Sequence, residues 1–473
     1  MFMAFIFIFS VLETDLILHL KLFIMPQSVF IQVGQCGNQI GYRFWDLAIQ
    51  EYQFYRSYTE DISSFFKIID TPRRSSSGFL DSVKARAILI DMEEGVVSEI
   101  LNGPLKCIFD RQQLVTDVSG SGNNWAVGNK FYGSKYRNRL IELFRKEVEE
   151  CDTLQCFFLL HSMGGGTGSG LGTATLEYLC DEFPKIPRFV FAAFPSSEDD
   201  VITSPYNTVL ANSQLINFAD CVFPFQNKAL IDVCNKALKM KRLHPTIIRN
   251  RTKSQSKPFD EMNDIIANTI LNLTCSSRFP GSLNVDINEI VMNMTPYPRL
   301  HYLISSMSPL FPLNDNCKVD QMFNEVFSAS HQLFHCSPTQ GILLASALLC
   351  RGQIAMSDVQ YNIERFKGNV KFVPWNKEGW KIGLCNIPHV TYSRSMLMLS
   401  NTTSIIKDLC HLKENFLKMY RKKAHLHHFL DVECMENDTF KYSLTDLQLL
   451  IEEYSNFESV SETSEKPRLK IKL

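Results

Sequence analysis

Cysteine pairs of the kind that close disulfides or hold zinc are missing from this 473-residue sequence. Its fourteen cysteines are scattered, and they include neither a CxxC pair nor a Cys/His array at zinc-ligand spacing. This argues against a disulfide framework and against a zinc-stabilised fold. Isolated cysteines in a long chain are typical of small buried apolar side chains in a reducing compartment.

A strong charge bias is also missing. The net charge is −2 and the pI is about 6.6, so the whole-chain charge gives no indication of a nucleic-acid partner. The apolar start MFMAFIFIFSVL has no basic residue before it and no small-residue cleavage site after it, and Glu13 and Asp15 interrupt it too early for a membrane span. We expect that the true start is Met25 and that residues 1–24 come from a wrongly extended gene model. A targeting or membrane role and an ordered extension are the alternatives.

Two common fingerprints of nucleotide-binding loops are absent. Without a GxxxxGK[ST] sequence the chain has no P-loop, and without a GxGxxG after its first predicted strand it does not match a dinucleotide oxidoreductase. Instead, a different glycine-rich loop lies between a predicted buried strand and a predicted helix. Its residues are Gly164, Gly165, Gly166, Thr167, Gly168, Ser169 and Gly170. Glycine allows close approach to a phosphate, and the helix that follows offers free N–H groups, so this loop predicts phosphate binding.

Short β-rich runs alternate with helical segments from residue 29 onward. We expect strands at 29–33, 87–91, 154–161 and 188–194, and helices at 35–52 and from about 171. The run at 154–161 is almost wholly apolar, as in a strand buried on both faces. This alternation predicts an α/β fold with a doubly wound parallel sheet.

A second α/β region and a helical end follow. A long apolar helix is expected at 259–275, and strands are expected at 300–305, 341–347, 370–373 and 396–400. Two apolar stripes at helical spacing predict core-facing helices: Ile405, Leu409, Leu412, Phe416 and Met419, then Phe440, Leu444, Leu447, Ile451 and Tyr454. Residues 459–473 are polar, and we expect them to be disordered.

A basic segment separates the two α/β regions. No acidic residue occurs between Asp232 and Asp260, where eight cations accumulate: Lys236, Lys239, Lys241, Arg242, Arg249, Arg251, Lys253 and Lys257. We interpret this segment as a solvated basic loop, with a partner-binding surface as the alternative.

Polar clusters follow several of the predicted strands. Besides the glycine loop, these are GQCGNQ at 34–39, Asp91-Met92-Glu93, which could hold Mg²⁺ through water, and SGSGNNW at 119–125. In an open α/β sheet the carboxyl ends of the strands present ligands. Four such clusters along one sheet edge predict a nucleotide pocket.

The motifs GQCGNQIG, SGSGNNWAVG, HSMGGGTGSG and RFPGSLNVD resemble the signatures of the tubulin superfamily, in the same order. The similarity extends from about residue 25 to about residue 457. Within the superfamily the chain most resembles the epsilon branch, through ARAILIDMEEGVVSEI, SEDDVITSPYN and KKAHLHHF. The resemblance implies a tubulin-type fold: a GTP-binding domain at 25–226, a core helix and second α/β domain at 227–402, and a helical C-terminal domain with a short basic tail at 403–473.

The resemblance also implies roles for single residues. GTP would be bound by the glycine loop together with Gln35, Cys36, Asn123, Ser162, Asp200, Asn227, Phe259 and Asn263. Asn227 and Asn263 would bind the guanine base, Phe259 would stack on it, and Asp200 would face the ribose. Glu93 would hold Mg²⁺ through water, with Gln35 nearby. One departure is Ser204, at a position where tubulins often have a glutamate near the ribose.

In the family, GTP hydrolysis is completed between two subunits. Asp286 and Glu289 match the acidic positions of an alpha-type subunit, so we expect Glu289 to promote hydrolysis of GTP held by a neighbour. A solvated helix glutamate is the alternative. The run HLHH at 425–428 lacks a tidy ligand spacing, and we expect no metal there.

Two further departures argue against a bulk microtubule subunit. The segment at 309–322 is short compared with the loop that makes lateral contacts in alpha- and beta-tubulin. The C-terminus ends in KPRLKIKL, where alpha- and beta-tubulin have an acidic tail. The resemblance instead implies a GTP-binding tubulin of the cytoplasm and cytoskeleton, at centrosomes, centrioles and basal bodies, with a role in doublet and triplet microtubules. Delta-tubulin, alpha- and beta-tubulin and centriolar microtubules are the implied partners, with no nucleic acid and no membrane. The alternative is an adaptor that binds GTP without hydrolysing it.

Overall fold

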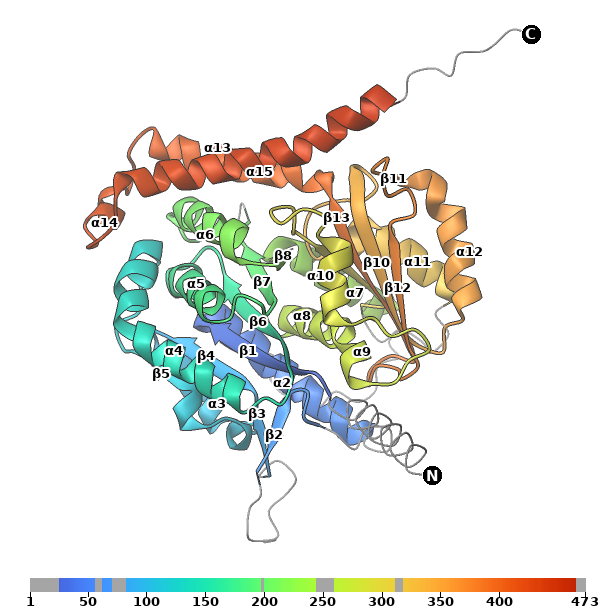
Figure 1. Ribbon diagram of the computed structural model, residues 1–473, viewed down its shortest axis with the longest axis horizontal. Helices are drawn as coiled ribbons and strands as arrows, with labels where there is room; N and C mark the ends of the chain where they lie inside the picture. Colours follow the sequence, from blue (N-terminus) through green and yellow to red (C-terminus); the bar gives the residue numbers. More distant parts are fainter. Residues whose placement is uncertain are drawn as a thin grey trace, which may run out of the picture.

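The computed structural model describes residues 25–55, 62–69, 82–196, 200–243, 259–310 and 318–464. Figure 1 shows an N-terminal sheet domain in blue to green, a second sheet domain in yellow to orange, and two long red helices laid across both. The N-terminal segment 1–24, residues 244–258 and the tail from 465 lie outside the described residues, as does half of the short segment expected at 309–322. The solvated basic loop expected at 236–257 is therefore described only in part, and the prediction is wrong for 236–243, which form the end of the helix Asn227–Leu243.

The first sheet has six parallel strands in the order β5-β4-β1-β6-β7-β8. They are β1 (Gln27–Val33), β4 (Ala87–Asp91), β5 (Leu114–Thr116), β6 (Leu154–Ser162), β7 (Arg188–Phe194) and β8 (Cys221–Gln226). The strands predicted at 29–33, 87–91, 154–161 and 188–194 are confirmed, and so is the doubly wound fold class. We did not predict β8, whose Pro224 is tolerated because β8 ends the sheet.

Helices cover both faces of this sheet. They are α2 (Gly34–Phe54), α3 (Glu94–Asn102), α4 (Gly133–Glu149), α5 (Gly172–Glu182), α6 (Ser204–Phe218), α7 (Asn227–Leu243) and α8 (Asp260–Leu273). Alternate residues of β1 enter separate cores, since Val29 and Ile31 pack with α4 to α6 while Phe30 packs with α2 and α8. A small hairpin, β2 (Phe66–Ile68) with β3 (Val83–Ala85), extends from the first domain.

The second sheet is mixed, with the order β11-β10-β13-β9 and β12 beside β10. Its strands are β9 (Ile304–Ser308), β10 (Ile342–Gly352), β11 (Lys371–Phe372), β12 (Trp380–Cys385) and β13 (Arg394–Thr402). Nearby are α9 (Cys275–Arg278), α10 (Ile287–Met294), α11 (Val319–Phe327) and α12 (Met356–Phe366).

The strand predicted at 300–305 has the wrong bounds, since the strand in this region is Ile304–Ser308. A turn closes there through the Leu300 N–H, which donates to the Tyr297 carbonyl over 3.0 Å, and β9 begins only at Ile304. The residues in between pair with the edge of the first sheet: the Val222 N–H donates to His301, and the Leu303 N–H donates to Val222. An apolar run therefore joins the two sheets before it enters the second one.

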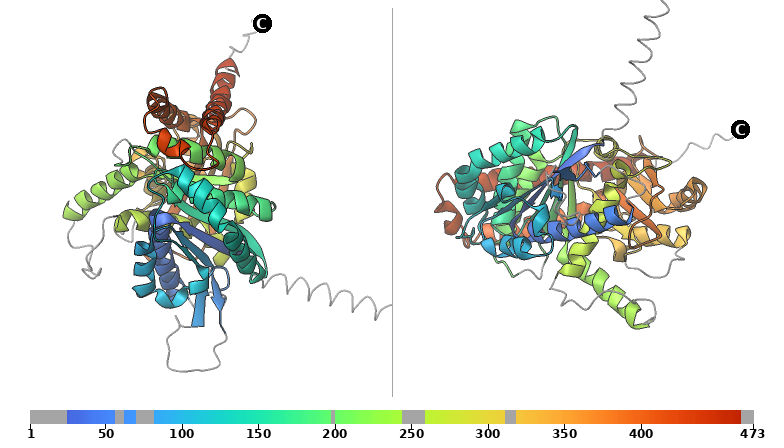
Figure 2. Two further views of the ribbon diagram at one scale, coloured as in Figure 1. Left: turned by 90° about the vertical axis from the view of Figure 1, so that its left-hand side faces the viewer. Right: turned by 90° about the horizontal axis from the view of Figure 1, so that it is seen from below.

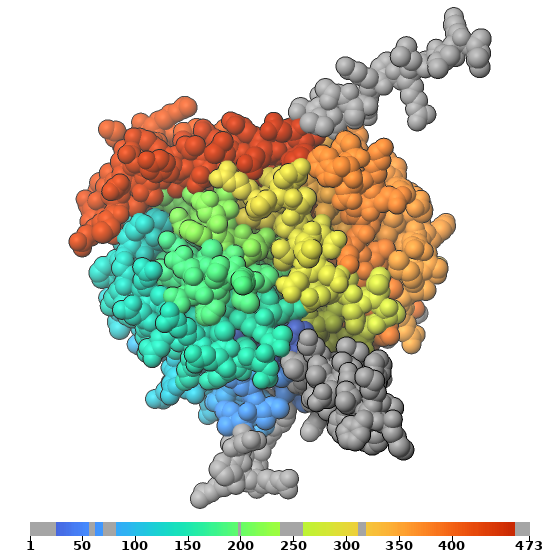
Figure 3. All heavy atoms as spheres, viewed as in Figure 1, coloured from blue at the N-terminus to red at the C-terminus, as the bar shows by residue number. Residues whose placement is uncertain are grey.

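The C-terminal helices are α13 (Ile406–Tyr420), the short α14 (His427–Leu430) and α15 (Asn437–Ser464). Both predicted stripes face the core: the Tyr206 ring of α6 lies 5.5 Å from each of the rings of Phe416, Phe429 and Phe440. The helix α15 continues to Ser464, so the disorder predicted from residue 459 is wrong for 459–464. Figures 2 and 3 show α15 extending along the surface of both sheet domains.

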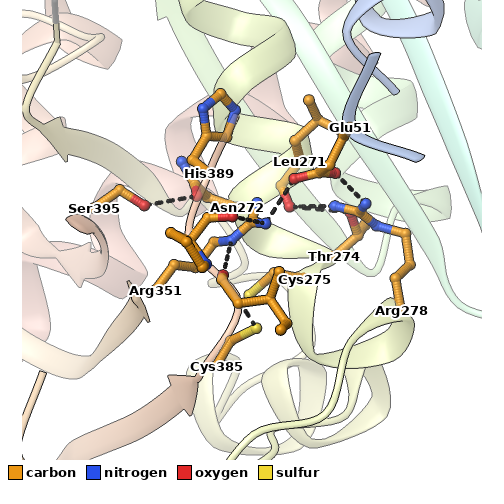
Figure 4. A network of polar contacts seen from close by, with 12 residues as sticks. Glu51, Leu271, Asn272, Thr274, Cys275, Arg278, Arg351, Cys385, His389 and Ser395 are labelled. Carbon is orange, nitrogen blue, oxygen red and sulfur yellow. Dashed lines mark hydrogen bonds and ion pairs between the residues drawn. The ribbon is translucent and has the colours of Figure 1, made fainter. Parts of the chain in front are cut away.

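A buried ion cluster links the two sheet domains (Figure 4). Glu51 of α2 pairs with Arg278 of α9 and with Arg351 of β10, whose Nη2 lies 2.6 Å from Glu51 Oε1. Glu51 and Arg351 are fully buried. Because a buried charge is costly unless it is paired, this cluster holds α2 and the second sheet in one relative position.

Candidate nucleotide-binding site

A cavity of about 270 Å³ lies where the carboxyl ends of β1, β4 and β6 meet the N-terminus of α2. Twelve of the predicted site residues line it: Gln35, Cys36, Glu93, Asn123, Ser162, Gly165, Gly166, Thr167, Gly168, Asn227, Phe259 and Asn263. Gly164, Ser169, Gly170 and Asp200 do not line it. The structure thus gathers most of the predicted nucleotide-binding residues, from segments more than 200 positions apart, around one space.

Close packing of backbone explains the glycines in the wall. Gly34 has φ +72°, and a Cβ atom there would lie 3.2 Å from the Gly168 nitrogen. A Cβ atom at Gly168 would come within 2.5 Å of Ser162 Oγ. The segments that follow β1 and β6 are therefore in direct contact. Gly164, Ser169 and Gly170 belong to the layer behind: Ser169 is fully buried and its hydroxyl donates to the Gly165 carbonyl.

The buried Asn207 of α6 fixes two of the loops together. Its Nδ2 donates to the Asn123 and Gly164 carbonyls over 2.8 Å each, and its Oδ1 accepts from the Trp125 N–H over 2.9 Å. We did not predict this positioning role, although Asn207 lies in the quoted segment SEDDVITSPYN. Its position at the start of a helix, facing two loops, becomes visible only in three dimensions.

The C-terminal helices also contact the loop at 119–125. Asn124 Nδ2 donates to the His428 carbonyl over 2.8 Å. The HLHH run therefore lies behind the nucleotide loop. Among the residues that the structure describes, no group of three or more His, Cys, Asp or Glu side chains could hold a metal by itself.

Two carboxylates border the cavity at the end of β4. Asp91 is buried, and its Oδ1 accepts from the Glu93 N–H over 3.2 Å, whereas Glu93 is exposed. Burial raises the pKa of Asp91 to about 6, and the Glu93 charge adds to the increase against the backbone hydrogen bonds. A cation here would favour the ionised form. Mg²⁺ typically takes one or two carboxylates together with phosphate oxygens and water, so Asp91, Glu93 and Gln35 suit Mg²⁺ brought by a nucleotide.

Cys36 borders the phosphate end of the cavity as an uncharged group. Loss of hydration raises the pKa of its thiol to about 12, so the thiol stays protonated near neutral pH. A neutral thiol does not repel phosphate, which is consistent with the predicted position of Cys36 against the phosphates.

The other end of the cavity suits a nucleobase. Asn227 begins α7, Asn263 lies in the first turn of α8, and each side-chain amide can both donate and accept hydrogen bonds. Phe259 caps α8 with a left-handed φ of +77° and is 47% exposed. Such a backbone is strained for an aromatic residue, and strained residues of this kind cluster at functional sites. Phe225, Leu230 and Met262 complete this end, and we had not singled them out.

Asp200 and Ser204 lie beyond the cavity wall. Asp200 is exposed, so its expected contact with a ribose stays a prediction. Ser204 begins α6 and is only 4% exposed, and its Oγ lies 2.9 Å from the position of a Cβ atom added at Gly164.

Residues 27–235 match the model of the Tubulin/FtsZ family, GTPase domain, and residues 298–413 match the tubulin C-terminal domain. The chain is 50% identical to the tubulin epsilon chains of Homo sapiens and Mus musculus, over 94% and 95% of its length and 100% of theirs. The chain belongs to the tubulin family. It is 34% identical to the tubulin alpha-1 chain of Saccharomyces cerevisiae, over 91% of this chain and 97% of that one. The expected resemblance to the epsilon branch is therefore confirmed, and the tubulin GTPase domain implies GTP as the nucleotide.

The two acidic residues expected to act in hydrolysis lie elsewhere in this tubulin. Asp286 caps α10, accepting from the Ile287 N–H over 2.8 Å and from Gln155 Nε2. Gln155 is near the start of β6, whereas Ser162, at the cavity, ends that strand. Seven residues of strand correspond to roughly 23 Å. The structure therefore does not bring Asp286 and Glu289 to their own chain's cavity.

Among the residues that the structure describes, no helix combines the length and apolar character needed to cross a membrane.

Proposed function

We propose that this chain is a GTP-binding tubulin of the centriole and basal body, which supports the assembly or maintenance of doublet and triplet microtubules. Its 50% identity to curated epsilon chains over their full length supports this assignment. Other tubulins, including delta-, alpha- and beta-tubulin, and centriolar microtubules would be its partners, in the cytoplasm at the centrosome. The GTP ligands would be the predicted site residues, and Mg²⁺ would accompany the nucleotide at Asp91, Glu93 and Gln35.

One observation supports a mechanism shared between two subunits. The nucleotide cavity and α10, the helix of Glu289 that Asp286 caps, lie toward opposite ends of β6. A surface with a nucleotide at one end and α10 at the other is suited to head-to-tail association, in which unlike faces meet. Four large apolar side chains around α10 support such a contact: Leu283, Met292, Tyr297 and Trp375 are 42%, 80%, 44% and 52% exposed. In this arrangement, α10 of one subunit covers the nucleotide of the next.

Glu289 is then the residue that orients the attacking water. Its carboxylate forms an ion pair with Lys381 of β12 and stays half exposed. The pair fixes the carboxylate on the outer side of α10 without burying it. A carboxylate so placed can accept a proton from water at a neighbour's γ-phosphate.

We expect Glu289→Gln to reduce GTP turnover in assembled complexes by about 100-fold or more, because general-base assistance is typically worth that much. GTP binding should stay unchanged. Lys381→Met is the matched control, since it breaks the same ion pair but keeps the carboxylate. Phosphate release measured at equal occupancy separates the two. Equal losses in both variants would assign Glu289 a purely structural role.

Localisation tests the cellular part of the proposal. The chain translated from Met25 with a C-terminal tag should concentrate at centrioles or basal bodies in ciliated or dividing cells. Labelling along cytoplasmic microtubules would contradict it. The alternative function, a GTP-bound adaptor on centriolar microtubules, keeps the same localisation and predicts no phosphate release with any tubulin partner.

A further inference from the structure

His161 is a buried polar residue in an otherwise apolar row of β6. Alternate residues of a strand face the same side of a sheet, so Phe157, Leu159 and His161 share one side of β6. Phe157 and Leu159 belong to the apolar core on that side, and His161 is as fully buried as they are. None of the roles that we predicted from the sequence uses the His161 side chain.

The imidazole of His161 lies against the glycine loop but does not line the nucleotide cavity. Its Nδ1 is 3.2 Å from the carbonyl oxygen of Ser162, a residue that lines the cavity. The backbone of Gly168, another residue of the cavity wall, also hydrogen-bonds to the ring. A Cβ atom added at Gly172 would lie 3.2 Å from the ring, so the start of α5 packs directly against it. His161 therefore contacts both ends of the loop that runs from Ser162 to Gly168.

The His161 ring is neutral near pH 7 and carries its proton on Nδ1. Burial lowers its pKa from 6.5 to about 4, while the hydrogen bonds to the backbone of Ser162 and Gly168 act in the opposite direction. A neutral imidazole has one N–H group, and a carbonyl oxygen can only accept. Nδ1–H therefore donates to Ser162, and Nε2, which has no hydrogen-bond partner among the described residues, is the bare nitrogen. An uncharged ring outside the cavity can act on a nucleotide only through the loop.

Packing alone does not explain a histidine at this position. A buried nitrogen without a partner is costly, and an apolar side chain like that of Phe157 or Leu159 would avoid this cost. What the histidine adds is the Nδ1–H donor, which no apolar side chain can supply. The contact of this donor with the backbone of the loop is therefore the feature that distinguishes His161 from the rest of its row.

The loop between Ser162 and Gly168 benefits from such a contact. Gly164, Gly165 and Gly166 follow one another in it, and glycine loses more conformational freedom than any other residue when it is ordered. Thr167–Leu171 then forms a π-helical turn, a rare conformation that is frequent at functional sites. Fixing both ends of this loop in advance reduces the freedom that a phosphate group must remove when it binds.

We propose that His161 is a positioning residue for the phosphates of GTP, because its Nδ1–H holds the backbone at both ends of the glycine loop in the phosphate-binding arrangement. This inference rests on the proposed GTP site and names a residue behind its wall that makes the site effective. Asn227 and Asn263, at the base end of the cavity, belong to other segments. Loss of the donor should therefore weaken phosphate binding and leave base recognition in place.

Competition of unlabelled GTP and of GMP with a fluorescent guanine nucleotide tests the proposal on the full chain. GMP keeps the base and the sugar but lacks the β- and γ-phosphates, so the ratio of the two affinities isolates their contribution. His161→Phe keeps a buried ring without the donor, and we expect it to lower the preference for GTP over GMP about fivefold or more. His161→Asn places an amide N–H near the position of Nδ1 and should restore most of the preference. His161→Gln places its amide nearer the position of Nε2 and should not restore it.

His301→Phe is the matched control. His301 is also fully buried, its Nδ1 lies 2.6 Å from the Pro298 carbonyl oxygen, and its Nε2 has no partner among the described residues. Burial lowers its pKa to about 4 as well, but His301 neither lines the nucleotide cavity nor belongs to the glycine loop. This change should lower the stability of the fold and leave the preference for GTP over GMP unchanged.

Three results would overturn the proposal. They are an unchanged preference in His161→Phe, equal losses of GTP and GMP affinity in that variant, and the same preference in His161→Asn as in His161→Gln. The comparison of these last two variants keeps the test decisive if thermal unfolding shows that His161→Phe does not fold. A wild-type chain that bound GTP no more tightly than GMP would instead contradict the proposed GTP site itself.

Discussion

Replacing both Asn227 and Asn263 by alanine should lower GTP affinity by about 30-fold or more and abolish the preference for guanine over adenine. Each amide can pair with the edge of a base, and a buried polar atom of the ligand left without a partner costs about 1–3 kcal/mol. Two such losses, about 2–6 kcal/mol together, correspond to about 30-fold or more in the dissociation constant. The apolar contacts of Phe225, Leu230 and Met262 remain in the variant, so residual binding should no longer discriminate between bases.

Competition between a fluorescent guanine nucleotide and unlabelled GTP or ATP measures this effect. Asn293→Ala is the control, because Asn293 is an exposed residue of α10, away from the cavity. If the double variant kept its GTP affinity and its preference for GTP, the base would have to bind elsewhere and the assignment of this end of the cavity would be wrong.

The second large effect is on stability. Glu51→Gln should lower the free energy of unfolding by about 3–5 kcal/mol, because it leaves two buried guanidinium groups facing one neutral amide. Figure 4 shows the geometry that creates this dependence. Arg278 also donates to the Leu271 carbonyl over 2.7 Å, and Arg351 donates to the Ile387 carbonyl over 3.2 Å, so neither cation can turn away to solvent.

Urea denaturation at neutral pH measures the change. Glu142→Gln, on the exposed face of α4, should alter the free energy of unfolding by less than about 0.5 kcal/mol. Equal stability of the wild-type chain and Glu51→Gln would mean that the ion cluster contributes nothing to the link between the two sheet domains.

The same cluster predicts sensitivity to acid. Burial alone would raise the pKa of Glu51, but Arg278, Arg351 and His389 lower it to about 2, below the ordinary value of 4.5. Burial, with Arg351, lowers the pKa of His389 from 6.5 to about 3. Both groups therefore bind protons more readily when unfolded. Their stabilisation is complete above pH 6.5 and is lost as the pH falls, through His389 first and then, below pH 4.5, through Glu51.

Much of the fold was predictable because local patterns determine it. The buried strands β4 and β7 have the predicted bounds, since continuous apolar runs ending in polar residues mark strands buried on both faces. The place of the glycine loop was predictable for a similar reason, because the apolar run that forms β6 ends just before it and the helical segment that ends in α5 follows it. The environment of such residues can be inferred from their neighbours along the chain.

Other features depend on contacts between distant segments, and the sequence alone does not reveal them. Asn207 acts through two loops more than 40 positions before it, and Glu51 meets Arg351 across 300 positions. The displaced start of β9 has the same origin: Leu303 is as apolar as a strand residue, but it pairs with Val222 of the other sheet.

The dependence of GTP turnover on concentration tests most directly the claim that this tubulin completes its catalytic site between subunits. Initial rates of phosphate release per chain would be measured over a wide range of protein concentration, alone and with other tubulins present. We predict that the rate per chain rises with the concentration of subunits, because Glu289 of one chain must reach the nucleotide of the next. A rate per chain that stayed constant at high dilution would show that one subunit hydrolyses GTP alone, and would contradict the account.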